Sequence, residues 1–238
     1  MSLIQSGSPS FKDEQLKYDR VFQAYKDKSE DVYAKLKRVG IHQQNFEIFI
    51  RGFKFEEDLE VWAKNIDEEN YKLVTTYKFC QNVGELGPKR REGDKQIPEG
   101  IYSISKFNPR SDFFLSLKID YPNKSDRVLS DQSYPGGLIF IHGGCETIGC
   151  IPITNSFIKE LYILCVEAKN NGQESIPIHL FPARLTHENF QLLSEQYPDK
   201  KLLNFWAQLK LGYFLFEKNR KIPEVFIHSN GAYDFVEK

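Results

Sequence analysis

Two kinds of hydrophobic pattern divide the chain. From about Lys12 to Arg38, apolar residues recur every three to four positions among charges, which predicts one or two amphipathic helices ending before Gly40. From Phe46 onward the apolar positions instead alternate in short runs separated by turn residues, as is typical of β-strands. The expected strands are 46–51, 59–64, 71–79, 101–107, 113–119, 138–141, 176–181 and 225–228.

The helical spacing returns in the second half of the chain. One helix is expected with Thr154 as its N-cap and its end before Gly172, and two more at 188–197 and 202–219. Residues 84–100 are rich in Gly, Pro, Lys and Arg and predict a long exposed loop. The mixture predicts a mainly β (α+β) fold with helices at both ends of the chain.

Composition narrows the class of protein. The chain has 238 residues, 40% of them hydrophobic, which is enough for one sizeable core. Lysine and arginine total 32 against 33 acidic residues, which argues against a nucleic-acid partner. No apolar stretch approaches the length of a membrane span, and residues 1–10 lack the basic start and apolar middle of a signal peptide. The start is expected to be either a cytoplasmic terminus or the residue after a removed targeting segment.

The four cysteines are too few for a disulfide framework in a chain of this length. Cys80 ends a strand-like run and Cys165 lies within a helical pattern, so both are expected to be small buried hydrophobes. Cys145 and Cys150 follow His142 in a glycine-rich segment between a buried strand and a helix. Any chemistry of the chain is expected there.

This segment suits nucleophilic catalysis. A thiolate is the reactive form of cysteine, and a helix N-terminus together with the His142 imidazole can lower the pKa of the Cys150 thiol. Backbone N–H groups of Gly149 and Cys150 could form an oxyanion hole. Gly143 and Gly144 would let the chain turn sharply and bring the imidazole back toward the sulfur.

Two other interpretations stay open at this point. Taken singly, Cys150 reads as a packed hydrophobe and His142 as a hydrogen-bonded surface residue. The second interpretation is a metal site formed by His142, Cys145 and Cys150. Their spacing matches no common zinc motif, and no fourth ligand lies nearby in the sequence.

The segment His142-Gly143-Gly144-Cys145, followed by Thr147-Ile148-Gly149-Cys150, resembles the active-site signature of YkuD-type L,D-transpeptidases, in a short-spaced branch that is called YafK-like. The resemblance covers roughly residues 44–235. Further blocks that are similar to this branch, in the same order, lie at 50–54, 59–62, 86–89, 93–100, 116–123, 176–179 and 205–213.

The resemblance implies a β-sandwich-like catalytic core. The implied organisation is an N-terminal helical segment at 1–43, a catalytic domain at 44–184, and a C-terminal helical extension at 185–238 packed on that domain. It also implies a periplasmic or cell-envelope location, which no visible signal supports.

The implied activity is thiol-dependent acyl transfer on peptidoglycan stem peptides. Cys150 would form an acyl thioester, His142 would act as general base and acid, and N–H groups of Gly149 and Cys150 would hold the oxyanion. A second stem amine as acceptor gives cross-linking, and a lipoprotein amine gives anchoring. Water gives hydrolysis, including release of a wall-linked lipoprotein. No cofactor is implied, and a catalytically silent peptidoglycan-binding module is the alternative of another class.

Two features depart from the commoner family pattern. Ile148 stands where that pattern has a second histidine, and the spacing from His142 to Cys150 is shorter, which leaves room for a hydrolase. Cys145 is an additional thiol, expected to be packed. An oxidised pair with Cys150 would silence the enzyme.

Other polar residues are weaker candidates for substrate binding. Lys89 and Arg90 could bind a stem carboxylate, although an exposed basic run is more often simply solvated. Tyr121 and Asn123 could line the groove, with turn formation as the simpler interpretation. His179 lies in an expected strand and is interpreted as structural.

Overall fold

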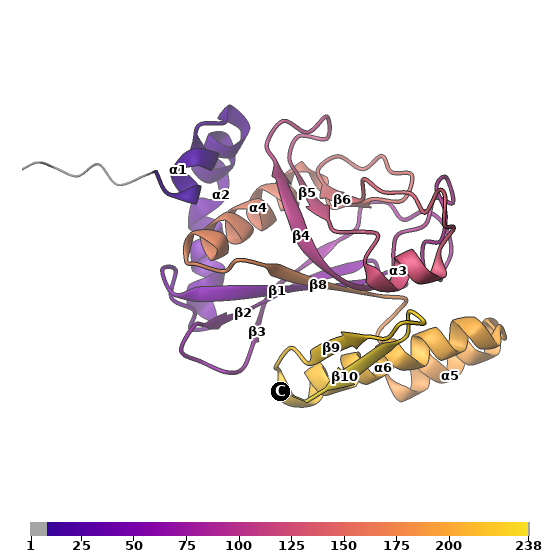
Figure 1. Ribbon diagram of the computed structural model, residues 1–238. Coiled ribbons are helices and arrows are strands. Elements are labelled where there is room, and N and C mark those ends of the chain that lie inside the picture. The colour runs from indigo at the N-terminus through magenta and orange to yellow at the C-terminus, as the bar shows by residue number, and fades with distance from the viewer. Residues whose placement is uncertain (1–8, 238) are drawn as a thin grey trace, which may run out of the picture.

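A single curled sheet of eight strands runs through the molecule, with helices on both of its faces (Figure 1). The structure is a computed structural model and describes residues 9–237. The interpretation of the chain start therefore falls largely on residues 1–8, outside the described part. In the described part, the strand order is β3-β2-β1-β8-β4-β5-β6-β7, with β1–β8 and β6–β7 parallel and the other neighbours antiparallel.

The sheet is built from two kinds of strand: longer ones from β3 to β4, and short ones from β5 to the β7 edge. Its members are β1 (Phe46–Phe53), β2 (Asp58–Asn65), β3 (Lys72–Lys78), β4 (Gly100–Asn108), β5 (Ser116–Ile119), β6 (Phe140–His142), β7 (Ile151–Pro152) and β8 (Ile176–Phe181). The other elements are α1 (Phe11–Leu16), α2 (Asp19–Arg38), α3 (Lys124–Leu129), α4 (Thr154–Asn170), α5 (His187–Gln196), α6 (Lys200–Asn219), and the hairpin β9 (Glu224–Ile227) with β10 (Tyr233–Val236).

Each face of the sheet has its own core. Helices α1, α2 and α4 pack on one face, where α4 lies between the sheet and α2 and is buried over most of its length. On the other face, Trp206 of α6 and Phe235 of β10 pack with Phe53 and Phe181 from the ends of β1 and β8. Because β1 is covered on both sides, nearly all of its residues are buried. The sheet is thereby held between two layers.

The expected mainly β fold with helical additions is confirmed, and so is the β1-β2-β3 meander. Three expectations of detail were wrong. Residues 113–115 are not strand, because β5 begins at Ser116. The turn-rich segment after Tyr121 contains α3, whose N-terminus is closed by a capping box between Asn123 and Asp126. The C-terminal extension also includes the β9–β10 hairpin, so it is not purely helical. The domain limits at residues 44 and 185 stay predictions.

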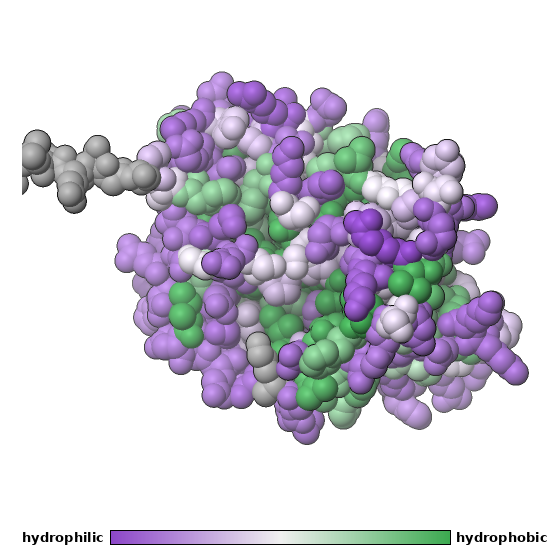
Figure 2. Space-filling view, viewed as in Figure 1, coloured by the Kyte–Doolittle hydropathy of each residue, from purple (hydrophilic) through white to green (hydrophobic). Residues whose placement is uncertain are grey.

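The surface is mostly hydrophilic on the face drawn in Figure 2, with apolar side chains gathered over the β9–β10 hairpin. Phe226 and Val236 are exposed there. Within residues 9–237, no helix combines the length and apolar character needed to cross a membrane.

Candidate active site

His142 and Cys150 lie at neighbouring positions on the edge of the sheet. Strand β6 ends at His142, and β7 begins directly after Cys150. These strands are parallel, with Ile141 opposite Ile151 and His142 opposite Pro152. Because side chains alternate along a strand, Cys150 projects to the same face as His142. The structure therefore places the two residues expected to react on neighbouring strands, His142 at the end of β6 and Cys150 directly before β7.

The His142 ring is set up to accept a proton. Its Nδ1 atom lies 2.6 Å from the carbonyl oxygen of Gly143, and since a carbonyl only accepts, Nδ1 carries the hydrogen. Nε2 is then left with its lone pair. Burial lowers the pKa of His142 below its ordinary value, so the ring is neutral near pH 7. The ring packs against Phe113, with centroids 4.5 Å apart.

The Cys150 thiol is half-buried and free. Its Sγ contacts the carbonyl oxygen of Leu138 at 3.7 Å, and no hydrogen bond among the described residues joins it to His142. Burial raises the pKa of the thiol, while the backbone of Phe140 and the ammonium group of Lys89 partly oppose that shift. The expectation of a lowered thiol pKa was wrong. The reason is that the sulfur is partly withdrawn from water, which disfavours the thiolate.

The helix after Cys150 begins within one residue of its expected start. Strand β7 intervenes, and α4 begins only at Thr154, with Ile153 as its N-cap. Thr154 is thus the first helical residue and not the N-cap, although its Oγ1 accepts the Phe157 N–H at 3.4 Å. The two residues of β7 and the N-cap Ile153 therefore separate Cys150 from the first turn of the helix that was expected to stabilise a thiolate.

Backbone N–H groups at the thiol converge on one oxygen atom. Those of Gly149 and Cys150 donate to Thr147 Oγ1 at 3.2 and 2.8 Å, and this hydroxyl donates to the Cys150 carbonyl at 2.9 Å. Gly149 adopts a φ of 128°, and a Cβ there would lie 3.0 Å from the backbone of Gln96. Glycine is therefore required for both conformation and space.

A cleft of about 330 Å³ opens beside the thiol. Its lining combines glycines with charged and apolar side chains: Lys89, Glu92, Gly93, Lys95, Gly136, Gly137, Leu138, Ile139, Ile148, Gly149 and Cys150. Leu138 and Ile148 are 69% and 80% exposed, unusually high for large apolar side chains. The position at which the commoner pattern has a histidine therefore adds apolar surface next to Cys150.

Lys89 is the one of the four proposed substrate-binding residues that lines this cleft. The expectation of an exposed, solvated basic run was wrong for it, because the residue is only 5% exposed. Its ammonium group donates to Asp94 Oδ1 at 2.6 Å and to the Arg91 carbonyl at 2.9 Å. Sequence reasoning missed the role of Asp94, although the Gly93-Asp94 pair in a loop is a turn signal.

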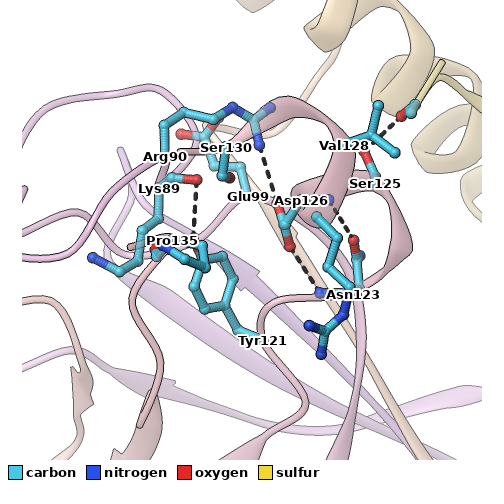
Figure 3. A network of polar contacts seen from close by, with 12 residues as sticks. Lys89, Arg90, Glu99, Tyr121, Asn123, Ser125, Asp126, Val128, Ser130 and Pro135 are labelled. Atoms are coloured by element: carbon cyan, nitrogen blue, oxygen red, sulfur yellow. Dashed lines mark hydrogen bonds and ion pairs between the residues drawn. The ribbon is translucent and has the colours of Figure 1, made fainter. Parts of the chain in front are cut away.

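Arg90, Tyr121 and Asn123 do not line the cleft and belong instead to a polar network that includes Asp126 of α3 (Figure 3). Arg90 pairs with Asp126 at 3.1 Å, the Tyr121 hydroxyl donates to the Pro135 carbonyl at 2.8 Å, and Asn123 caps α3. Burial raises the pKa of Asp126 to about 6. These contacts join the long loop to α3. The residues that were predicted to bind substrate therefore have structural contacts here.

A disulfide ties the reactive segment to β3. Cys80 and Cys145 are bonded to each other, 65 positions apart in the chain. The interpretations of Cys80 as a buried hydrophobe and of Cys145 as a packed residue or a partner of Cys150 were therefore wrong. The end of β3 lies beside β7, where the Cys80 N–H donates to the Pro152 carbonyl at 2.9 Å.

The disulfide also weakens the metal hypothesis. Cys145 is removed from the set that included His142 and Cys150. Within residues 9–237, no group of three His, Cys, Asp or Glu side chains is arranged to hold a metal ion.

His179 and Cys165 lie apart from the cleft. His179 is buried against the Phe49 ring, with centroids 4.6 Å apart, and burial lowers its pKa to about 3. Cys165 is fully buried in α4. Both have the structural environments that were expected.

The YkuD L,D-transpeptidase catalytic domain model matches residues 65–179, which include His142 and Cys150. The chain is 38% identical over 188 residues to the Escherichia coli (strain K12) protein named "Putative L,D-transpeptidase YafK", covering 78% of this chain and 72% of that protein. This chain belongs to the YkuD-type L,D-transpeptidase family. The family membership predicted from the His142–Cys150 segment is thereby confirmed.

Two solved structures are more distant from this L,D-transpeptidase-family chain. The helical cell shape determining protein Pgp2 from Campylobacter jejuni has a TM-score of 0.46 and 16% identity, covering 83% of this chain and 80% of that one. Bdellovibrio bacteriovorus Bd1075 has a TM-score of 0.42 and 19% identity, covering 79% of each chain.

Proposed function

We propose that this protein is a cysteine-dependent L,D-transpeptidase that transfers an acyl group of a peptidoglycan stem peptide through a thioester on Cys150. The observation that carries the proposal is the parallel β6–β7 pairing, which sets Cys150, on the wall of an open cleft, next to the strand that ends at the buried His142. A neutral imidazole with a free Nε2 is the form that a general base requires.

In the first half of the reaction, the thiol leaves the Leu138 carbonyl and turns toward His142. Nε2 accepts the thiol proton as Sγ bonds to the carbonyl carbon of the scissile amide. The carbon–nitrogen bond then breaks, and the imidazolium gives the proton to the departing amine. A raised thiol pKa suits this order, because the proton leaves the sulfur only as the base takes it.

The N–H groups of Gly149 and Cys150 are the proposed oxyanion donors. Their present convergence on Thr147 Oγ1 supports the assignment, since both already point at one position the size of an oxygen atom. In the tetrahedral intermediate, the substrate oxygen would replace the threonine hydroxyl as their acceptor.

The second half of the reaction depends on the acceptor. His142 takes a proton from an incoming amine or water, which attacks the thioester, and the proton returns to the sulfur as Cys150 is released. An amine gives a new peptide bond and water gives hydrolysis. Ile148 is apolar and cannot act as a second imidazole, so His142 is the proposed base for either acceptor.

The disulfide supports a location in the cell envelope. Disulfides form and persist in oxidising compartments such as the periplasm and are rare in the cytosol. The Cys80–Cys145 bond fits the compartment in which peptidoglycan is found.

The test uses muropeptides of defined stem length, incubated with wild-type protein and with Cys150→Ala and His142→Ala. Cys165→Ala serves as the matched control, because this free cysteine is buried in α4 away from the cleft. Mass spectrometry of the products, and of a trapped acyl adduct on the Cys150 peptide, is the readout. Loss of activity in both site variants, but not in Cys165→Ala, is expected.

The products separate the remaining readings. Cross-linked or exchanged stems establish a transpeptidase. Stems that are shortened, or separated from a lipoprotein, without new bonds establish a hydrolase. Intact substrates bound equally by wild type and Cys150→Ala would overturn the enzymatic proposal in favour of a binding module.

A further inference from the structure

The segment between His142 and Cys150 is crosslinked near its middle. Cys145 forms the disulfide with Cys80, which lies two residues after the end of β3. The Cys80 N–H also donates to the Pro152 carbonyl in β7. One cysteine thus holds both the segment before the nucleophile and the strand after it.

The other attachments of this segment lie toward its two ends. On the His142 side, the Gly144 N–H donates to Asn155 Oδ1 at 2.8 Å, and the Gly144 carbonyl accepts the Thr154 N–H at 3.3 Å. On the Cys150 side, hydrogen bonds from the Gly149 and Cys150 N–H groups to Thr147 are internal to the segment, and the chain is next held by the pairing of β7 with β6. The middle of the segment is exposed to solvent. Within residues 9–237, the disulfide is the one crosslink that joins this segment to the chain after β3.

We propose that Cys80 and Cys145 are positioning residues for the proposed thiol reaction. Their disulfide keeps the His142–Cys150 segment in the conformation that presents the nucleophile and its N–H groups to the cleft. This inference rests on the proposed function and adds a redox condition to it. The oxidised protein is the active form, and reduction of the disulfide lowers its activity.

Reduction is chemically accessible at this position. Cys145 is exposed and Cys80 half-buried, so a small reductant reaches the bond from solvent. A water-soluble phosphine supplies the two electrons and becomes a phosphine oxide. Water supplies the oxygen and the two protons, and both cysteines become thiols. A phosphine is preferred to a thiol reductant because a thiol would itself attack an acyl thioester.

The effect on the reaction follows from geometry. Covalent catalysis requires reacting atoms that are aligned to a fraction of an ångström, and displacement by about 1 Å can cost about 100-fold in rate. With the disulfide open, the segment between Gly144 and Thr147 keeps only its attachments at the ends. We expect turnover to fall by about 10- to 100-fold.

The experiment compares wild type, Cys80→Ser/Cys145→Ser and Cys165→Ala. Mass spectrometry after alkylation under denaturing conditions first counts thiols in wild type, where two are expected before phosphine treatment and four after it. The rate of iodoacetamide alkylation at Cys150 is then measured against pH after removal of the phosphine, and turnover is measured on muropeptides. Circular dichroism identifies preparations that remain folded.

We expect the double variant and phosphine-treated wild type to lose turnover together and to show an altered pH profile at Cys150, while phosphine leaves the double variant unchanged. A purely structural disulfide would change the melting temperature but not that profile. Should the double variant fail to fold, reduction of already folded wild type tests the same point.

Two results would overturn the inference. One is a count of four thiols in the untreated protein. The other is an unchanged alkylation profile and turnover after the disulfide is opened. If wild type turns over no muropeptide, the proposed function fails, and the alkylation profile still decides whether the disulfide positions Cys150.

Discussion

Glu99 is a buried carboxylate whose removal should be costly. It is fully buried, and its Oε1 lies 2.9 Å from Lys54 Nζ and accepts the Gly87 N–H at 2.7 Å. Its Oε2 accepts the indole N–H of Trp206 at 2.7 Å. One side chain thereby joins the central sheet, the long loop that leads to Lys89, and helix α6.

The substitution Glu99→Gln removes the charge while keeping the shape, so no cavity forms. Lys54 would retain neutral acceptors, namely the Gly87 and Ile97 carbonyls at 2.8 and 3.1 Å and Gln96 Oε1 at 3.5 Å. Breaking a buried ion pair by neutralising one partner costs about 3–5 kcal/mol, because the remaining charge stays out of water. The Gly87 N–H and the Trp206 indole N–H face different oxygens of Glu99, so in the glutamine variant one of them would face the NH2 group, which cannot accept a hydrogen bond. We expect the free energy of unfolding to fall by about 3–5 kcal/mol.

Urea unfolding followed by tryptophan fluorescence and circular dichroism measures this difference. Glu85→Gln is the matched control, because Glu85 lies in the same loop and is exposed. It should change the free energy of unfolding by less than about 0.5 kcal/mol. If Glu99→Gln also stays within about 1 kcal/mol of wild type, then the buried pair does not contribute as its geometry indicates.

Three further predictions address the site and the core. Thr147→Val leaves the Gly149 and Cys150 N–H groups without their acceptor, so we expect the free energy of unfolding to fall by about 1–3 kcal/mol. Thr147→Ser keeps the hydroxyl and should not lower it. Urea unfolding measures both variants, and equal values for the two would contradict this prediction. Burial raises the pKa of Cys150 above its ordinary value of 9.0, so the thiolate is scarce at neutral pH. The rate of alkylation by iodoacetamide should therefore keep rising beyond pH 9. A plateau of that rate by pH 8 would refute the raised pKa. In Gly212→Ala, the new Cβ would lie 2.3 Å from the Phe235 ring, and this overpacking should lower the melting temperature at a cost of about 1–3 kcal/mol, unlike Gly137→Ala, where the space is open.

Much of the site could be predicted because it lies within nine residues. The β6 strand, His142 and Cys150 are close in the chain, and their residue types carry a chemical pattern that needs no distant partner. The meander could be predicted equally well, because the alternation of apolar and polar residues within each strand is a local property. Short elements such as α3 and β7 were missed because they contain less than two full periods of any pattern.

What lay beyond prediction depends on distant parts of the chain. Cys80 and Cys145 pair across 65 positions, and no local feature marks either one as a partner. Lys89 belongs to a basic run that is typically solvated, yet packing against Gly136 and Asp94 buries it.

The sequence by itself determined the family, the alternation of strands and helices, and the two residues expected to react, because each is encoded by neighbours in the chain. Only the tertiary structure decided the disulfide, the lining of the cleft, and the direction in which the Cys150 pKa is shifted. The physical reason is that a pKa depends on how much water the fold excludes from a group and which charges it brings near. Those quantities arise from packing between segments that are far apart in sequence.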